Sequence, residues 1–324
     1  MSTVTIGARY LVRGVWCATL SPLSETNGLD AVRLAGHVRR LFASGVDGIA
    51  LFGTTGEGQS FSLAERKEGL DDLLAAGIDR RRILVATGCA ALPETIELTR
   101  HAIESGCESA LIVPPFFFKD IGEDAVYASY SRVIDAIADP RLHLYLYHIP
   151  KVSGVSIPIE AIERLVDAYP ATIAGVKDSD GDLEHTRALL ARFPALAILV
   201  GHEPHLPAAL AAGGAGTICG IANLFPQLMR RLHDGALAGD GRGDTLLIER
   251  FVALLERFPL FAAFKALQAQ LTGDPGWEAL RLPLIALDAD ARRAWLDAVA
   301  GLGIDFQRDG ACLTERAQDR SRRL

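Results

Sequence analysis

The sequence predicts an α/β fold, a (β/α)8 TIM barrel with an appended C-terminal helical layer, and three observations support it. Short apolar runs alternate with longer amphipathic stretches, which is typical of βαβ units in a parallel sheet. Eight such units over about 220 residues match a closed barrel. After residue 224 the apolar runs stop and only helical patterns continue. An open, doubly wound sheet is the alternative that the pattern leaves.

Each predicted strand is a short apolar run, and each predicted helix follows one of them. Two helix starts carry local signals. Ser62 stands three residues before Glu65, which predicts a capping box, and Pro93 favours a first helical turn. The predicted strands are 11–18, 46–52, 83–86, 109–113, 142–147, 173–176, 197–200 and 216–219, and the predicted helices between them are 30–44, 63–76, 93–105, 123–138, 158–168, 183–193 and 204–212.

The predicted organisation has three parts along the chain. Residues 1–224 form the barrel, residues 225–302 form helices packed on it, and residues 303–324 form a charged tail. We expect the end of this tail, residues 313–324, to be frayed. The predicted helices of the appended layer are 226–237, 245–258, 260–271 and 288–300.

Composition excludes several functional classes. The net charge is −7 and no basic run occurs before the last few positions, so we expect no binding to nucleic acid or to an anionic membrane. The N-terminus has no apolar h-region, so we expect no signal peptide, and no apolar stretch is long enough for us to expect a membrane span. The cysteines have no metal-ligand spacing and fit a reducing, cytoplasmic compartment. They are Cys17, Cys89, Cys107, Cys219 and Cys312.

One lysine stands apart from the others. Lys177 follows a buried run at the C-terminal end of predicted strand 6, where barrel enzymes place catalytic residues. Desolvation there favours the neutral amine, a nucleophile that can attack a ketone. The alternative is a lysine paired with Asp178 or Asp180. The other lysines are Lys67 on a polar helix face, Lys119 and Lys151 in loops, and Lys265 in an apolar helix, where its stem could snorkel to water.

A glycine-rich segment follows predicted strand 2. In Gly53-Thr54-Thr55-Gly56-Glu57-Gly58 two threonines stand between glycines, so backbone N–H groups and hydroxyls can face one ligand together. Such donors suit a carboxylate without needing a cation. A simple tight turn is the alternative interpretation.

Predicted strand 5 places a tyrosine beside Lys177. Tyr147 ends the alternating run at 142–147, next to strand 6, and a phenol there can relay protons. A tyrosine that is merely hydrogen-bonded in the barrel mouth is the alternative. For the adjacent His148 a structural role is favoured over a chemical one.

Four motifs together resemble one family. GTTGEG, VPPFFF, YHIPKVSG and GVKDSDGDL, in this order, resemble the dihydrodipicolinate synthase and N-acetylneuraminate lyase superfamily over about residues 10–300. The resemblance implies a (β/α)8 barrel with C-terminal helices, usually a homotetramer built as a dimer of dimers. It also implies a class I lyase of a 2-oxo acid that uses no metal or organic cofactor.

The resemblance implies a role for each matched position. Lys177 matches the Schiff-base lysine and Tyr147 the proton-relaying tyrosine. Thr54 and Thr55 match the pair that binds the pyruvate carboxylate, with Thr54 also in the relay. The remaining expected substrate-binding residues are Gly53, Ile218, Gly201, Ser179 and Glu203, with His202 as a further candidate for the distal half of the substrate.

Four departures from the family pattern limit what the resemblance implies. Phe117 replaces the synthase's second tyrosine, and Val152 replaces the arginine that binds the distal carboxylate of its aldehyde. Synthase activity is therefore not expected. Pro204 and Gly220 replace an acid and a serine of the sialic acid lyase branch, which puts sialic acid itself in doubt.

The predicted function is a retro-aldol lyase that splits a hydroxylated 2-oxo acid into pyruvate and an aldehyde. A dehydratase of a 2-keto-3-deoxy sugar acid could use the same lysine. A non-catalytic 2-oxo acid-binding barrel is the third hypothesis, and it gives no reason for an amine nucleophile.

Overall fold

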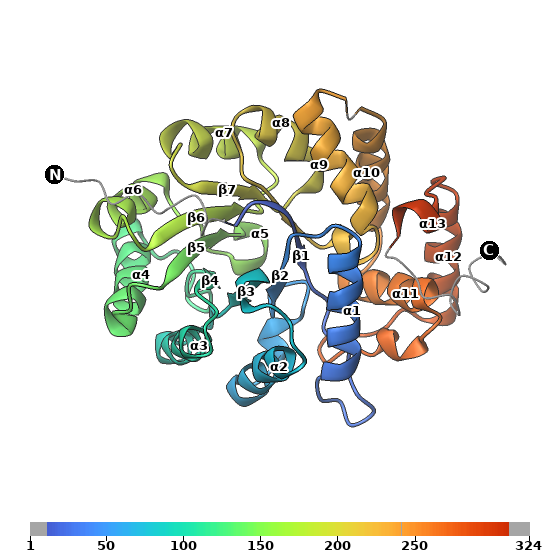
Figure 1. The fold of residues 1–324 in the computed structure, drawn as a ribbon, viewed down its shortest axis with the longest axis horizontal. Coiled ribbons are helices and arrows are strands. Elements are labelled where there is room, and N and C mark those ends of the chain that lie inside the picture. The colour runs from blue at the N-terminus through green and yellow to red at the C-terminus, as the bar shows by residue number, and fades with distance from the viewer. Residues whose placement is uncertain (1–11, 241, 311–324) are drawn as a thin grey trace.

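The computed structural model describes residues 12–240 and 242–310. Its eight parallel strands form a closed barrel in chain order, so the predicted barrel is confirmed and the open sheet is excluded (Figure 1). Strands 5 and 6 run one and two residues further than predicted, respectively, so that Lys177 lies inside a strand. The strands are β1 (Gly14–Ala18), β2 (Gly48–Leu51), β3 (Ile83–Ala86), β4 (Ser109–Ile112), β5 (His143–His148), β6 (Ile173–Asp178), β7 (Ala197–Val200) and β8 (Gly216–Cys219).

The barrel helices lie outside the strands, and their starts show the predicted signals (Figure 1). The Ser62 side chain caps the Glu65 N–H at 3.3 Å, and Glu65 accepts the Ser62 N–H at 2.9 Å. The predicted helix 204–212 begins as a 3-10 turn at Glu203–His205. The helices are α1 (Ala31–Ala43), α2 (Leu63–Ala75), α3 (Leu92–Glu104), α4 (Glu123–Ile137), the short α5 (Pro150–Ser153), α6 (Ile159–Ala168), α7 (Leu183–Arg192) and α8 (Leu206–Ala211).

The barrel interior is a packed core of mostly small side chains with a few aromatic ones. Tyr145 is fully buried, and its hydroxyl accepts the Val12 N–H at 2.7 Å near the N-terminal ends of the strands. Tyr147 lies two residues further along β5, in the same interior cluster. Because the interior is filled, a ligand can enter only at an end of the barrel, and the C-terminal end carries the predicted site.

The C-terminal layer packs beside the barrel, next to α1 (Figure 1). Its last helical turn contains Asp309, which is fully buried and pairs with Arg231 at 2.8 Å. The predicted charged tail therefore begins with a packed turn, and its predicted frayed end, residues 313–324, lies outside the described residues. The helices are α9 (Pro226–Ala238), α10 (Arg242–Leu255), α11 (Leu260–Thr272), α12 (Ala289–Ala300) and α13 (Phe306–Asp309).

The expected snorkelling of Lys265 is wrong. This lysine of α11 is fully buried and pairs with Glu57 from the glycine-rich segment, whose side chain is also inaccessible to water. Its Nζ also donates to the carbonyl of Ala279 at 2.7 Å. The pattern of α11 alone could not show that an acid from another element meets the lysine inside the protein.

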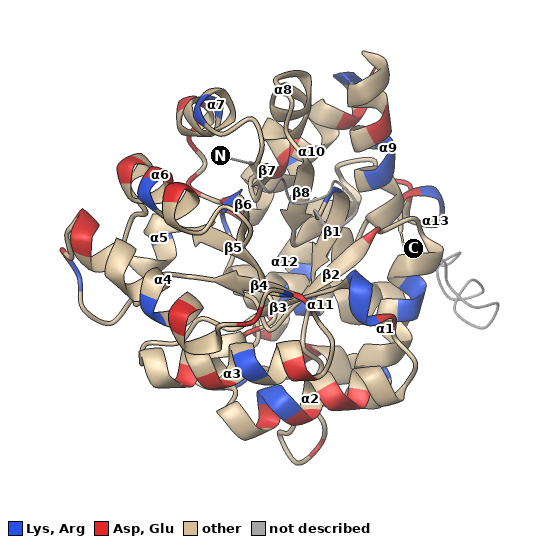
Figure 2. Ribbon diagram, turned by 60° about the vertical axis from the view of Figure 1, so that its left-hand side comes forward, with Lys and Arg blue, Asp and Glu red and all other residues tan. Residues whose placement is uncertain are grey.

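Charges of both signs are spread over the outer helices such as α2 and α3, while most of the strands carry none (Figure 2). Among the described residues, no helix combines the length and apolar character needed to cross a membrane. Cys17, Cys89, Cys107 and Cys219 are buried free thiols, and Cys312 lies outside the described residues.

Candidate active site

Three predicted catalytic side chains meet at the C-terminal end of the barrel. Tyr147 of β5 is paired in register with Lys177 of β6, so their side chains leave neighbouring strands at the same height. The Lys177 Nζ lies 4.2 Å from the centre of the Tyr147 ring. The Thr54 Oγ1, from the segment after β2, lies 3.1 Å from the Tyr147 Oη. The hydroxyls form a chain that can carry a proton between the threonine and the tyrosine.

These side chains open into a cavity of about 440 Å³, within the range of roughly 300–1,000 Å³ common for small-molecule sites. Gly53 lines instead an adjacent cavity of about 300 Å³, which shares Thr54 and Tyr147 with the first. His202 lies outside both and contacts the His205 ring edge-to-face. The predicted residues in the larger cavity are Thr54, Thr55, Tyr147, Lys177, Ser179, Gly201, Glu203 and Ile218.

The alternative interpretation of Lys177, a lysine paired with a neighbouring aspartate, does not match the geometry. Among the described residues Lys177 makes no ion pair, although its side chain is buried. The Asp178 carboxylate faces away from it and accepts hydrogen bonds from His185 at 3.1 Å and Thr186 at 2.7 Å. Burial would raise the pKa of Asp178, but these hydrogen bonds outweigh burial and lower it. The amine of Lys177 is thus left to the cavity.

The glycine-rich segment is held by its own backbone and by α11. The Gly58 N–H donates to the Gly53 carbonyl at 3.1 Å, and the Glu57 N–H donates to the Thr54 carbonyl at 3.0 Å. Glu57 adopts a left-handed conformation, with φ of 53°, which turns the chain sharply. Its carboxylate then reaches Lys265 of α11. The ion pair therefore fixes the segment that carries Thr54 and Thr55.

Two polar side chains that follow β6 and β7, Ser179 and Glu203, line the cavity together with Lys177. Ser179 fits against Gly201, where an added Cβ would lie only 1.9 Å from the Ser179 Oγ, so this close approach requires glycine. The Glu203 carboxyl is buried and accepts the Ile221 N–H at 3.3 Å. Burial raises the pKa of Glu203, while backbone hydrogen bonds and Lys177 oppose this only in part.

Sequence reasoning missed the outer wall of the cavity. Five apolar side chains and Glu256 come from α10, α11 and the connection between them. No sequence motif identifies these residues, because they reach the barrel only through packing of the appended layer. The apolar spacing along α10 and α11 is the one sequence feature that could have indicated a buried face there. The apolar side chains are Val252, Leu255, Phe258, Leu260 and Phe264.

The four departures from the family pattern occupy different places. Phe117 is 71% exposed and lines neither cavity, whereas its neighbour Phe116 lines the smaller one. Val152 lines both cavities. Pro204 lies in the 3-10 turn, and Gly220 lines the larger cavity, where an added Cβ would lie 3.1 Å from the Phe264 ring.

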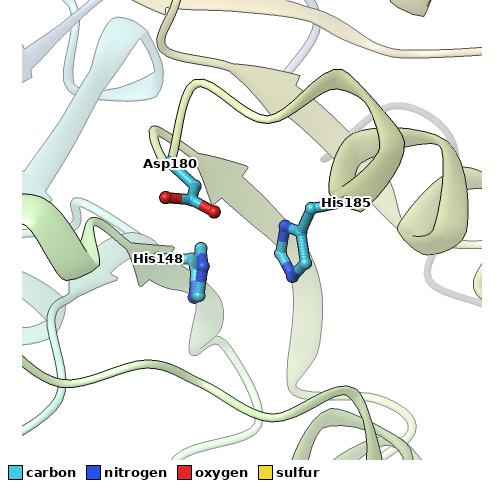
Figure 3. Close-up of side chains that lie close together, drawn as sticks. All are labelled: His148, Asp180 and His185. Carbon is cyan, nitrogen blue, oxygen red and sulfur yellow. The ribbon is translucent and has the colours of Figure 1, made fainter.

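One set of described side chains, His148, Asp180 and His185, has metal-ligand spacing, with candidate ligand atoms within 4.8 Å of one another (Figure 3). The His148 Nδ1 accepts the Ile157 N–H at 3.1 Å, so its lone pair is used, and the other ring nitrogen of the neutral imidazole carries the proton. His185 bonds to Asp178 and its ring stacks on His148 at 4.4 Å. These contacts explain the set as a support for the ends of β5 and β6, and we assign no metal to it.

Comparison with known proteins agrees with this arrangement. The Dihydrodipicolinate synthetase family matches residues 11–300 of the chain. An uncharacterized DapA-like lyase of Chloroflexus aurantiacus is 37% identical over 298 residues, which cover 89% of this chain and 98% of that protein.

Solved structures share the fold. The dihydrodipicolinate synthase of Agrobacterium tumefaciens superposes with a TM-score of 0.85 at 33% identity, covering 90% of this chain and all of that one. The N-acetylneuraminate lyase of Proteus mirabilis gives a TM-score of 0.80 at 25% identity, covering 90% of this chain and 99% of that one. The chain therefore belongs to the dihydrodipicolinate synthetase family and is a lyase of that family.

Proposed function

We propose that the protein is a class I aldolase that cleaves a 4-hydroxy-2-oxo acid into pyruvate and an aldehyde through a Schiff base on Lys177. The observation that carries the proposal is the buried Lys177 amine beside Tyr147, with Thr54 at 3.1 Å from the tyrosine hydroxyl. A protein that only binds a 2-oxo acid has no need of a buried amine without a counterion.

The chemistry starts at the ketone of the substrate. Thr54 and Thr55 hold the carboxylate, and the Lys177 amine, after loss of a proton, adds to the C2 carbonyl carbon. Loss of water from the carbinolamine gives an iminium, which draws the electrons of the C3–C4 bond toward nitrogen.

Tyr147 then accepts the proton of the C4 hydroxyl. As the C3–C4 bond breaks, the Tyr147 oxygen takes up this proton while its own phenol proton passes through the Thr54 hydroxyl to solvent. The aldehyde leaves, and an enamine of pyruvate remains on the lysine. The hydrogen bond between Tyr147 and Thr54 positions the phenol and provides a path for the phenol proton. Protonation of the enamine at C3 and addition of water to the iminium release pyruvate and restore the amine.

Borohydride trapping tests the central step. With pyruvate and borohydride, we expect the intact mass to increase by the mass of pyruvic acid less one oxygen atom, with the modification on Lys177. Lys177→Arg should abolish the adduct, and Lys67→Arg, a change in a surface lysine on α2, should keep it. An adduct on another lysine, or none, contradicts the proposal.

A dehydratase is the second candidate, and Glu203 is the observation that favours it. Its buried carboxyl lies in the same cavity, and burial raises its pKa, so it could protonate a departing C4 hydroxyl. Product analysis on 2-keto-3-deoxy acids separates the two reactions. Pyruvate release supports the aldolase, and loss of water without pyruvate supports the dehydratase.

Three further expectations stay predictions. These are a homotetramer built as a dimer of dimers, a cytoplasmic location, and a reaction that uses no metal or organic cofactor. Synthase activity is not expected, because Val152 lines the cavity where a cation would have to bind a distal carboxylate.

A further inference from the structure

We infer that the substrate beyond C4 is an uncharged and largely apolar chain, so that the second product of cleavage is an apolar aldehyde. This inference rests on the proposed function, since it concerns the half of the substrate that Lys177 does not hold. It is carried by the distribution of polar, charged and apolar side chains around one cavity.

Most polar groups of the cavity come from the barrel strands and the segments that follow them. Thr54, Thr55 and Tyr147 surround the position of the 2-oxo acid, with Lys177 at the centre. Ser179 and Glu203 follow β6 and β7, respectively, and line the same cavity. Their side chains can form hydrogen bonds with one hydroxyl or carbonyl oxygen, and the proposed substrate has such an oxygen at C4.

The outer wall is mostly apolar and comes from the C-terminal layer. Leu255 and Phe264 are buried, Val252 and Phe258 are half-buried, and Leu260 is exposed at the rim. A chain of several hydroxyls extending along this wall would lose its water and would find a single hydrogen-bonding side chain there, that of Glu256. A hydrocarbon chain there would gain by leaving water.

The Phe264 ring packs close to Gly220 at this wall. A Cβ at position 220 would lie 3.1 Å from the Phe264 Cζ and 3.4 Å from the Thr55 Cγ2. The aromatic ring therefore takes the space into which a polar side chain from position 220 would extend.

Charge excludes an anionic chain as well. Lys177, which the Schiff base uses, is the single cation among the residues that line this cavity, whereas Glu203 and Glu256 are acids. Val152, at the mouth, is 65% exposed and offers no charge. A carboxylate at the far end of the substrate would find no cation among the residues that line the cavity and would face Glu256.

The test is run in the direction of carbon–carbon bond formation. The protein is incubated with pyruvate and one of three aldehydes of similar length: pentanal, erythrose or succinic semialdehyde. The 4-hydroxy-2-oxo acid product is measured by mass spectrometry. We expect kcat/KM for pentanal to exceed that for each of the others at least tenfold.

Several outcomes overturn the inference. These are a preference for erythrose or for succinic semialdehyde, and equal rates with all three. No product from any aldehyde in a preparation that borohydride and pyruvate modify on Lys177 contradicts instead the aldolase reaction of the proposed function. Absence of that adduct contradicts the proposed function itself, so the two failures are distinguishable.

A charge introduced at the mouth provides the matched comparison. Because Val152 is exposed, Val152→Arg should fold normally and should raise the ratio of kcat/KM for succinic semialdehyde to that for pentanal at least tenfold. Val32→Arg, an 86% exposed position on α1 that lines neither cavity of the site, should leave the ratio unchanged. An unchanged ratio in Val152→Arg contradicts the inferred position of the aldehyde chain.

Discussion

Removing the buried lysine of α11 tests how the C-terminal layer supports the active site. Lys265→Met keeps the length and the apolar stem of the side chain but removes the ammonium that pairs with Glu57. The Glu57 carboxylate would then stay buried, with only the Arg281 N–H at 3.4 Å as a further donor.

The magnitude follows from burial. Both side chains are inaccessible to water, and an uncompensated charge left by breaking such a pair costs about 3–5 kcal/mol. The double variant Glu57→Gln/Lys265→Met removes both charges, so we expect it to be less destabilised than Lys265→Met alone, with a coupling of about 0.5–3 kcal/mol. The Glu57 backbone N–H donates to the Thr54 carbonyl, so a shift of Glu57 would also move Thr54. Lys265→Met should therefore raise the KM for the 2-oxo acid.

Urea unfolding at one fixed protein concentration measures the free energy, with fluorescence and circular dichroism compared to check two-state behaviour. Lys67→Met is the matched control, because Lys67 pairs with Glu97 at 2.6 Å on the surface and such pairs contribute only about 0–1 kcal/mol. If Lys265→Met loses no more stability than Lys67→Met, or if adding Glu57→Gln brings no recovery, the reasoning about the buried pair is refuted.

Three other perturbations have defined outcomes. Tyr147→Phe should lower the cleavage rate roughly 100- to 10,000-fold while borohydride still traps pyruvate on Lys177; an equal loss of trapping would argue against a proton relay. Thr54→Val, which removes the hydroxyl 3.1 Å from the Tyr147 Oη, should raise the KM for pyruvate and lower kcat; a change in neither would place the carboxylate elsewhere. Burial lowers the pKa of His37 from 6.5 to about 3. Between these two pH values the unfolded chain binds a proton on His37 that the folded chain does not. The free energy of unfolding should therefore fall as the pH drops below 6.5. That contribution is roughly 2 kcal/mol between pH 7 and pH 5, and a urea titration of His37→Gln at both values should show a correspondingly smaller difference than the parent protein.

The sequence by itself predicted the barrel, with an open sheet as the alternative, and the residues at the centre of the candidate site. Apolar runs alternating with helical patterns predict parallel strands in chain order, and in a closed barrel consecutive strands are neighbours. Tyr147 and Lys177 stand near the ends of consecutive runs, so their proximity follows from strand order and register. Thr54 follows β2 at the same end of the barrel, which explains why three residues far apart in the chain could be placed together.

The tertiary structure alone decided the outer half of the site. The ion pair of Glu57 with Lys265 and the approach of Phe264 to Gly220 join α11 to barrel loops, and no strand register relates these elements. Packing of the appended helices against the barrel depends on the shapes and volumes of many side chains together. A periodic pattern of apolar residues does not contain that information. For this reason the sequence predicted the pyruvate half of the substrate, whereas the apolar wall for its other half became visible only when the C-terminal layer was seen against the barrel.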